Sequence, residues 1–86
     1  MRELEIGRVT HYYTKIGVAA IKILNGELKV GDKIHIKGHK TDLTQQVESM
    51  QKEHKVIEVA KEGDEIGIKV NEHVREGDLV YKIEED

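Results

Sequence analysis

The stretch Lys29-Val30-Gly31-Asp32-Lys33-Ile34-His35-Ile36-Lys37 joins a tight turn to a run of alternating polar and apolar residues. Glycine adopts positive φ without steric cost, and an aspartate side chain bonds its neighbouring backbone, so Gly-Asp marks a turn. The alternation that follows is typical of a half-buried strand. This stretch therefore predicts one corner of an all-β fold.

The same Gly-Asp pair occurs twice more, at Gly63-Asp64 and Gly77-Asp78, and an Ile- and Val-rich run follows each pair. Such runs suit a pleated, half-buried surface, so each turn is expected to launch a strand. The separations between the three turns are unequal and their flanking segments do not match. We interpret them as recurrent turns of one domain and not as an internal repeat.

Six or seven strands are predicted, since one segment near residue 57 also fits a short helix. In chain order the predicted strands are 4–13, 18–23, 33–37, 47–51, 55–58, 65–70 and 79–83. Gly7 is expected to form a bulge in the first strand, and Ala19 and Ala20 imply a close approach by a neighbour. Full closure removes exposed strand edges, so a small closed Greek-key β-barrel is the expected architecture.

Composition limits the chain to one domain, residues 1–86, without room for a separate catalytic domain. Phe, Trp, Cys and Pro are absent, so the core must come from Ile, Val, Leu, Ala and Met, and no disulfide or thiolate chemistry is possible. The formal net charge is −3, with both signs interspersed. This balance argues against a generally basic nucleic-acid clamp.

The longest apolar-leaning stretch, 16–24, contains Lys22 and falls far short of the ~20 apolar residues of a membrane span. The amino terminus is charged and has no hydrophobic signal segment. We therefore expect a cytoplasmic protein without a membrane partner. Abundant Lys and Glu, with two Asn and three Gln, favour a thermophilic source.

A basic patch is predicted on the strand 33–37. Period two places Lys33, His35 and Lys37 on one face, and His39 and Lys40 follow directly. Such a patch can neutralise a phosphate backbone, so these five residues are candidate RNA contacts. The alternative is an ordinary solvated outer face of a barrel strand.

Two of the three tyrosines stand together near the end of the first strand. His11, Tyr12, Tyr13 and Lys15 form a cluster of aromatic and polar residues. Such clusters stack on bases or anchor protein interfaces, so these residues are candidate partner contacts. The alternative is that one Tyr covers the barrel mouth while the other lies outside.

Metal and catalytic sites are not expected. His35 and His39 are four residues apart, but a strand running into a loop does not align ligands at that spacing. The three Gly-Asp aspartates are explained as turn residues, and no nucleophile motif or Walker-type phosphate loop is present. The sequence therefore predicts neither an enzyme nor a cofactor.

Several segments together resemble the second domain of translational GTPases such as elongation factor Tu and the GTPase initiation factors. These segments are Ile6–Val9, Val18–Asp32, Val47–Met50, Gly63–Gly67 and Arg75–Val80. The resemblance implies a Greek-key β-barrel that, in the family, packs against a GTPase domain and contacts ribosomal RNA. In some members it also contacts the aminoacyl end of transfer RNA.

The chain departs from this family in two ways. It has no GTPase domain, so GTP binding and hydrolysis are not carried over. It has Lys15-Ile16-Gly17 where several members have Gly-Arg-Gly before the second strand. Similar barrels also occur as accessory domains, including the carboxy-terminal part of some collagenase-like peptidases that act with RNA-modification systems.

Our hypothesis is a stand-alone, non-catalytic binding module that engages RNA or a ribonucleoprotein related to transfer RNA or the ribosome. The family-like turns and the basic patch motivate it. The alternative is a protein-interaction or assembly module that docks to a GTPase, to another protein or to itself. The acidic net charge and the Tyr12-Tyr13 pair favour this alternative.

Overall fold

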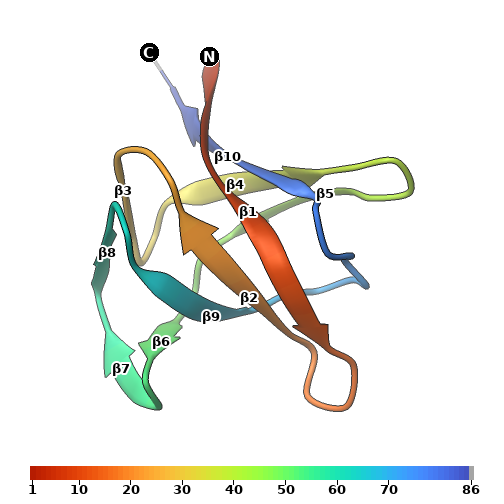
Figure 1. Ribbon diagram of the computed structural model, residues 1–86. Coiled ribbons are helices and arrows are strands. Elements are labelled where there is room, and N and C mark those ends of the chain that lie inside the picture. Colours follow the sequence, from red (N-terminus) through yellow and green to blue (C-terminus); the bar gives the residue numbers. More distant parts are fainter. Residues whose placement is uncertain (86) are drawn as a thin grey trace.

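The computed structural model describes residues 1–85 and shows an all-β chain in which those residues form no helix (Figure 1). Alternating apolar residues define most of the strands. In chain order the strands are β1 (Arg2–Tyr13), β2 (Val18–Ile23), β3 (Glu27–Lys29), β4 (Lys33–Lys37), β5 (Asp42–Gln46), β6 (Met50–Lys52), β7 (Lys55–Ile57), β8 (Val59–Lys61), β9 (Glu65–Lys69) and β10 (Leu79–Glu84).

Eight of these strands form one antiparallel sheet in the order β5-β4-β10-β1-β2-β9-β6-β7, and β3 pairs with β8. The last strand, β10, returns to lie between β1 and β4, as a Greek-key connection requires. In Figure 1 the sheet curls around a single interior, with β1, β2 and β9 on one side and β4 and β5 behind them. The expected all-β fold is confirmed.

The interior is filled by aliphatic side chains that point inward from every second strand position. These buried residues are Ile6, Val9, Ala19, Ile21, Ile23, Leu28, Ile34, Ile36, Leu43, Val47, Met50, Ala60, Ile66, Ile68, Val70, Val74 and Val80. The core therefore has the aliphatic composition that the absence of Phe and Trp demands. Along residues 1–85 no helix is long and apolar enough to cross a membrane.

The three Gly-Asp turns share one geometry, which confirms their predicted role as corners. Their glycines have φ of 100°, 94° and 90°, in the left-handed region that glycine occupies without strain. Each aspartate side chain accepts a 2.8 Å hydrogen bond from the backbone N–H three residues earlier. The N–H of each aspartate donates back to the carbonyl of that same residue. The turns are thus closed twice, by backbone and by side chain.

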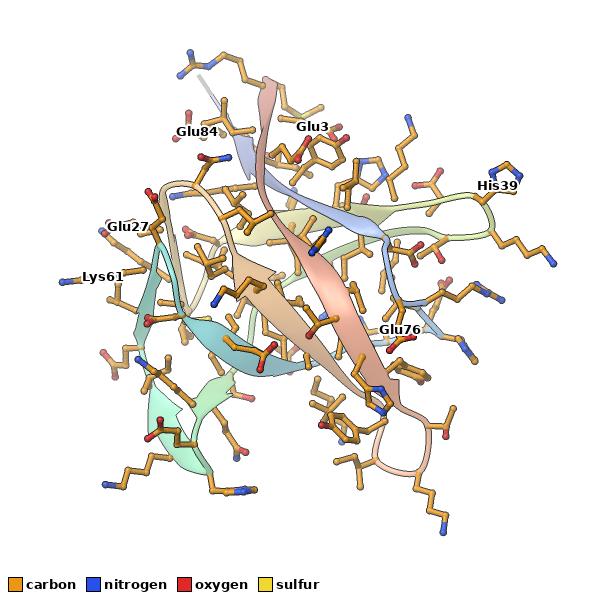
Figure 2. The ribbon with its side chains drawn as sticks, viewed as in Figure 1. Glu3, Glu27, His39, Lys61, Glu76 and Glu84 are labelled. Carbon is orange, nitrogen blue, oxygen red and sulfur yellow. The ribbon has the colours of Figure 1, made fainter. Side chains whose placement is uncertain are left out.

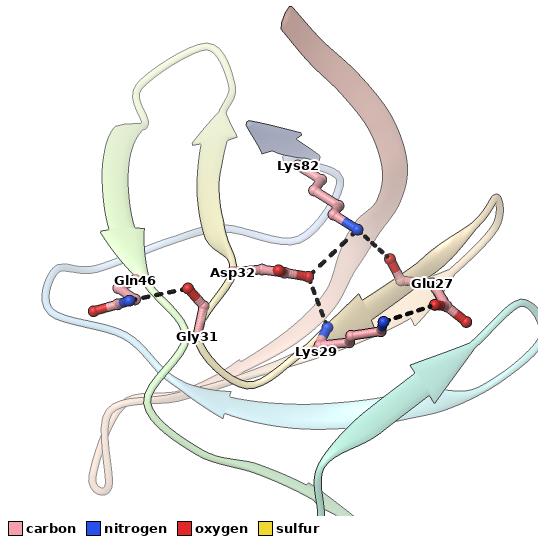
Figure 3. Close-up of polar contacts among 6 residues, drawn as sticks. All are labelled: Glu27, Lys29, Gly31, Asp32, Gln46 and Lys82. Carbon is pink, nitrogen blue, oxygen red and sulfur yellow. Dashed lines mark hydrogen bonds and ion pairs between the residues drawn. The ribbon is translucent and has the colours of Figure 1, made fainter. Parts of the chain in front are cut away.

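Asp32 has a further structural task (Figure 3). Lys82 Nζ lies 3.4 Å from both the Asp32 carboxylate and the carbonyl oxygen of Glu27, so it ties β10 to the first Gly-Asp turn. Gln46 Nε2 donates to the carbonyl of Gly31 at 2.9 Å from the other side. The carboxylate of this turn is committed to the fold.

The strand predicted at 47–51 is misplaced. The structure has β5 at Asp42–Gln46, three residues outside any strand, and then β6 from Met50. The inward positions here are Leu43, Gln45 and Val47, and a glutamine in the middle hides the apolar alternation. Six strands have five residues or more, and four short strands of three residues each accompany them.

Gln45 is buried because it bridges two parts of the barrel wall. Its Nε2 donates to the carbonyl of Lys69 at 2.9 Å, and its Oε1 accepts from the N–H of Asn71 at 2.8 Å. The amide side chain therefore joins β5 to the end of β9, where the sheet order provides no strand ladder between them.

Candidate functional site

A groove of about 660 Å³ lies on the outer face of the sheet, over β2 and β9. Its walls are two hairpins, the turn between β1 and β2 on one side and the turn between β6 and β7 on the other. β6 pairs with β9, and β1 pairs with β2, so the groove spans four neighbouring strands. These four strands bring together residues that are distant in sequence.

The floor of the groove is made of small side chains. Ala20 on β2 is directly opposite Gly67 on β9, and Val18 lies beside them. A Cβ at Gly67 would come within 3.3 Å of Val18 Cγ1, so this part of the floor is tightly packed. Outer positions of small barrels usually carry longer polar side chains. Here their absence at Ala20 and Gly67 leaves the sheet surface open to a flat ligand.

Exposed apolar groups form one wall. Tyr13 at the end of β1 is 49% exposed, and Ile16 in the following turn is 62% exposed. The opposite wall is the β6–β7 turn, where Glu53 and His54 have φ of 51° and 66°. Both central residues of a type I′ hairpin turn need positive φ, a conformation that costs non-glycine residues free energy. The tight turn keeps this wall close to the floor.

Carboxylates gather at one end of the groove. Asp64 Oδ1 accepts a hydrogen bond from Lys52 Nζ at 2.8 Å, and Glu65 Oε2 accepts from the Thr10 hydroxyl at 3.1 Å. The hydrogen bond from Lys52 and then that from the Lys61 N–H lower the pKa of Asp64. The same contact with Asp64 raises the pKa of Lys52. With Glu53 on the wall, this end offers mainly hydrogen-bond acceptors.

A second, smaller depression of about 260 Å³, here called the hollow, lies beside the groove. It is formed by the end of β1 and the loop before β10, with His11, Tyr12, Thr14, His73, Val74, Arg75 and Glu76 around it. The rings of Tyr12 and His73 have centroids 4.6 Å apart and are tilted by 36°. The rings of His11 and Tyr13 meet edge to face at 4.4 Å. Figure 2 shows Glu76 beside the end of β1.

The structure brings the predicted partner-contact residues together around these two sites. Tyr13 lines the groove, whereas His11 and Tyr12 line the hollow. Lys15 is exposed in the turn between Thr14, which lines the hollow, and Ile16, which lines the groove. Sequence reasoning missed His73 and the β6–β7 turn, because neither carries a local motif. It included Gly67 in the family-like segment Gly63–Gly67 but did not reveal that Gly67 forms the floor of a groove.

The predicted basic patch is divided by acidic neighbours. Lys33, His35 and Lys37 do share the outer face of β4, as expected. His35 is held between two carboxylates, with Nδ1 2.7 Å from Glu3 and Nε2 2.5 Å from Asp42. These hydrogen bonds, of which the one to Glu3 has the larger effect, raise the pKa of His35. Lys33 Nζ lies 3.4 Å from Glu85.

The remaining members of the patch stand apart from these pairs. His39 projects from the tip of the β4–β5 hairpin (Figure 2), and Lys40 beside it is also exposed. Within residues 1–85 no carboxylate lies at ion-pair distance from Lys37 or Lys40. Contact of these residues with RNA stays a prediction. Over the same residues no group of three His, Asp or Glu side chains could hold a metal ion.

The sequence of this chain is similar to one family model and to parts of several longer proteins. The family model described as elongation factor Tu domain 2 matches residues 17–81. An uncharacterized protease of Methanocaldococcus jannaschii is 47% identical over 85 residues, which cover 98% of this chain and 21% of that protein. A collagenase of Porphyromonas gingivalis is 36% identical over 84 residues, covering 96% of this chain and 20% of the collagenase.

Solved structures resemble the fold closely. The C-terminal domain of a putative U32 peptidase of Geobacillus thermoleovorans matches with a TM-score of 0.85 at 21% identity, covering 96% of this chain and 94% of that domain. Its selenomethionine variant matches with a TM-score of 0.83 at 19% identity, covering 88% of this chain and 95% of that one. At these identities the match concerns the fold. The chain spans about a fifth of the length of the curated relatives it matches.

Proposed function

This chain belongs to the elongation factor Tu domain 2 family, and from that premise we propose that it is a non-catalytic module binding the end of a single-stranded RNA. The RNA would be transfer RNA or ribosomal RNA, either free or within a ribonucleoprotein. The terminal nucleoside occupies the groove over β2 and β9. The groove itself is the observation that carries the proposal.

The shape of the groove suits a nucleobase. A flat ring lies on the small floor formed by Ala20 and Gly67, and the exposed ring of Tyr13 is available to stack on it. Unpaired RNA bases are commonly recognised by stacking on aromatic side chains, a contact that each base can make. Ile16 extends the apolar wall beside Tyr13.

The charge of the groove favours a terminal nucleoside over an internal nucleotide. Its acidic end carries three carboxylates, those of Glu53, Asp64 and Glu65, and one ammonium, that of Lys52, which is paired with Asp64. The net charge at this end is therefore negative, so it accepts hydrogen bonds and repels phosphate. Ribose hydroxyls at a 3′ end are donors and fit such acceptors. A 3′-phosphate would bring negative charge against these carboxylates.

The proposal assigns no chemistry to this chain. Asp64 is held by a turn and by Lys52, and Glu65 accepts from Thr10, so both carboxylates have binding and structural partners. The relatives named as a protease and a collagenase are about five times longer than the matched region. In proteins of that length we assign catalysis to the remainder of the polypeptide, with this barrel as the part that holds RNA.

The test is a fluorescence anisotropy titration with a 5′-labelled single-stranded RNA, measured at several salt concentrations. Ala20→Leu fills the floor of the groove, and Thr44→Leu makes a comparable change at an exposed position of β5. We expect Ala20→Leu to weaken binding about tenfold or more, because the larger side chain takes the space in which the base would stack on Tyr13, and Thr44→Leu to leave binding unchanged. A 3′-phosphate on the RNA should also weaken binding. Absence of salt-dependent binding by the unaltered protein contradicts the proposal.

A second candidate function is a protein-interaction module, and exposed valines favour it. Val56 on β7 is 72% exposed, and Val30 and Val59 are each 39% exposed. Val59 on β8 is paired with Lys29 on β3, and Val30 is the residue that follows Lys29. Val30 and Val59 therefore lie on adjoining segments. Light scattering of the purified chain distinguishes self-association from a monomer, and a monomer excludes self-association as the basis of this second function.

A further inference from the structure

We infer that the hollow beside the groove is a second base-stacking subsite, which takes the base of the penultimate nucleotide of the same RNA strand. The inference rests on the proposed function of the groove and adds the register and direction in which the strand lies. It is carried by the paired rings of Tyr12 and His73, by the ridge between the two depressions, and by Lys15.

The rings around the hollow form a rigid platform. Tyr12 packs against the buried core, and the exposed His73 ring lies on it with centroids 4.6 Å apart. A ring that is supported in this way loses little conformational freedom when a base stacks on it. The chain contains three Tyr and five His, and four of these eight rings, His11, Tyr12, Tyr13 and His73, gather at this one edge of the barrel.

The hollow and the groove are separated by a ridge formed by two rings, those of His11 and Tyr13. His11 lines the hollow, Tyr13 lines the groove, and their rings touch edge to face at 4.4 Å. A strand with its last nucleoside in the groove therefore reaches the hollow by crossing this ridge. Adjacent unstacked bases splayed over protein rings are a common form of single-strand recognition.

Lys15 is placed to meet the phosphate that joins the two nucleotides. It lies in the turn between Thr14 at the hollow and Ile16 at the groove, and its side chain is exposed. An ammonium at this point neutralises a linking phosphate that the acidic end of the groove would repel. The two depressions thus divide the recognition of base, ribose and phosphate among different side chains.

The rim of the hollow offers polar groups for a base edge. Arg75 is fixed there, because its Nη1 donates to the carbonyl of Lys40 at 3.1 Å and to the Thr41 hydroxyl at 3.2 Å. Glu76 Oε1 lies 3.5 Å from His11 Nδ1. Together with the Thr14 hydroxyl, these groups supply donors and acceptors around an aromatic platform.

The test combines altered RNA with altered protein. The probes are a 5′-fluorescein RNA tetranucleotide with a free 3′ end and the same RNA with an abasic residue at the penultimate position. The proteins are the unaltered chain, His73→Ala, His73→Phe and Ala20→Leu, each first shown to unfold cooperatively. We expect the abasic probe to bind the unaltered chain about tenfold more weakly, the scale of one stacked base.

His73→Ala should lose a similar factor for the intact RNA and nothing further for the abasic RNA, because both changes remove the same contact. His73→Phe should restore the affinity for the intact RNA. If the intact RNA binds but His73→Ala weakens both probes equally or neither, the second subsite is refuted while the groove proposal stands. If His73→Ala has the expected effect and Ala20→Leu has none, the groove proposal fails instead. No binding of either probe refutes both.

Lys15 provides an independent readout. Lys15→Ala should lower the slope of log affinity against log salt by about 0.7, the value for one phosphate contact on a single strand. Lys29→Ala, which removes an exposed lysine on β3 outside both depressions, is the matched control and should leave the slope unchanged. Equal slopes for the two variants would place the linking phosphate elsewhere and contradict the proposed strand path.

Discussion

His35 Nδ1 lies 2.7 Å from Glu3 Oε1, a contact that joins β4 to the start of β1 across β10. Asp42 on β5 contacts the other ring nitrogen, so one imidazole on β4 links β1 to β5. The sequence alone predicts that His35 belongs to a basic patch. In the folded protein it is first a link between strands.

This link predicts a pH dependence of stability. The two carboxylates raise the pKa of His35 in the folded state above that of the unfolded chain. The contribution of the charged His35 to the free energy of unfolding is therefore complete below the pKa of the unfolded chain, about 6.5. It is lost as the pH rises through the higher pKa of the folded state. The difference in Tm between the unaltered chain and His35→Gln should be larger near pH 6, just below the pKa of the unfolded chain, than near pH 9. An equal difference at both values would show that the charged link does not contribute.

Gly7 should tolerate no side chain. The register of β1 shifts between Glu5 and Gly7, which confirms the predicted bulge, and a Cβ at Gly7 would overlap the backbone carbonyl of Lys22. Because backbone cannot move aside easily, Gly7→Ala should lower the free energy of unfolding by about 2 to 3 kcal/mol. Gly67→Ala is the matched change in β9 and should cost less than about 1 kcal/mol, since only Val18 Cγ1 must shift. Urea unfolding measures both, and equal costs would contradict this view of the bulge.

Gln45 should matter far more than its neighbour Gln46. Gln45→Ala leaves the carbonyl of Lys69 and the N–H of Asn71 without their partner, at an expected cost of about 2 to 3 kcal/mol. Gln46 is exposed and donates one hydrogen bond to Gly31, so Gln46→Ala should cost about 0.5 to 1 kcal/mol. Urea unfolding of the two variants tests this, and a cost for Gln45→Ala no larger than that for Gln46→Ala would show that the bridge is dispensable.

The members of the basic patch should differ in their effect on RNA binding. Lys33 is paired with Glu85, whereas in the described part of the chain Lys37 and Lys40 have no carboxylate at ion-pair distance. A phosphate therefore displaces no existing ion pair at Lys37 or Lys40. Lys37→Ala and Lys40→Ala should each reduce the salt slope of RNA binding by up to about 0.7, and Lys33→Ala should reduce it less. A larger effect of Lys33→Ala would contradict this ranking.

The fold was largely predictable because its corners are local. Each Gly-Asp turn depends on adjacent residues, so sequence reveals it, and the strands after the turns follow from alternation. β5 was not predictable, since Gln45 occupies an inward position and its two backbone partners lie more than twenty residues away. Only the folded chain shows that this polar residue belongs inside.

The candidate site was predictable only where it is continuous in sequence. His11, Tyr12, Tyr13 and Lys15 are close neighbours and attract attention as an aromatic cluster. Gly67 lies near this cluster because β9 pairs with β2, and His73 lies near it because the loop before β10 packs against Tyr12. His73 carries no motif, the motif around Gly67 does not show which strand it faces, and no period links either residue to β1. The acidic neighbours of His35 were hidden for the same reason.

The most direct test of RNA binding in the groove is a map of backbone amide shifts in ¹H–¹⁵N spectra as the RNA tetranucleotide is added. We expect the largest shifts at the groove and its walls, at Tyr13, Ala20, Glu53 and Gly67, and a further shift at His73 when the second subsite is filled. Shifts confined to the β4–β5 hairpin around His39, or no shifts at all, would contradict the claim that the groove over β2 and β9 binds RNA.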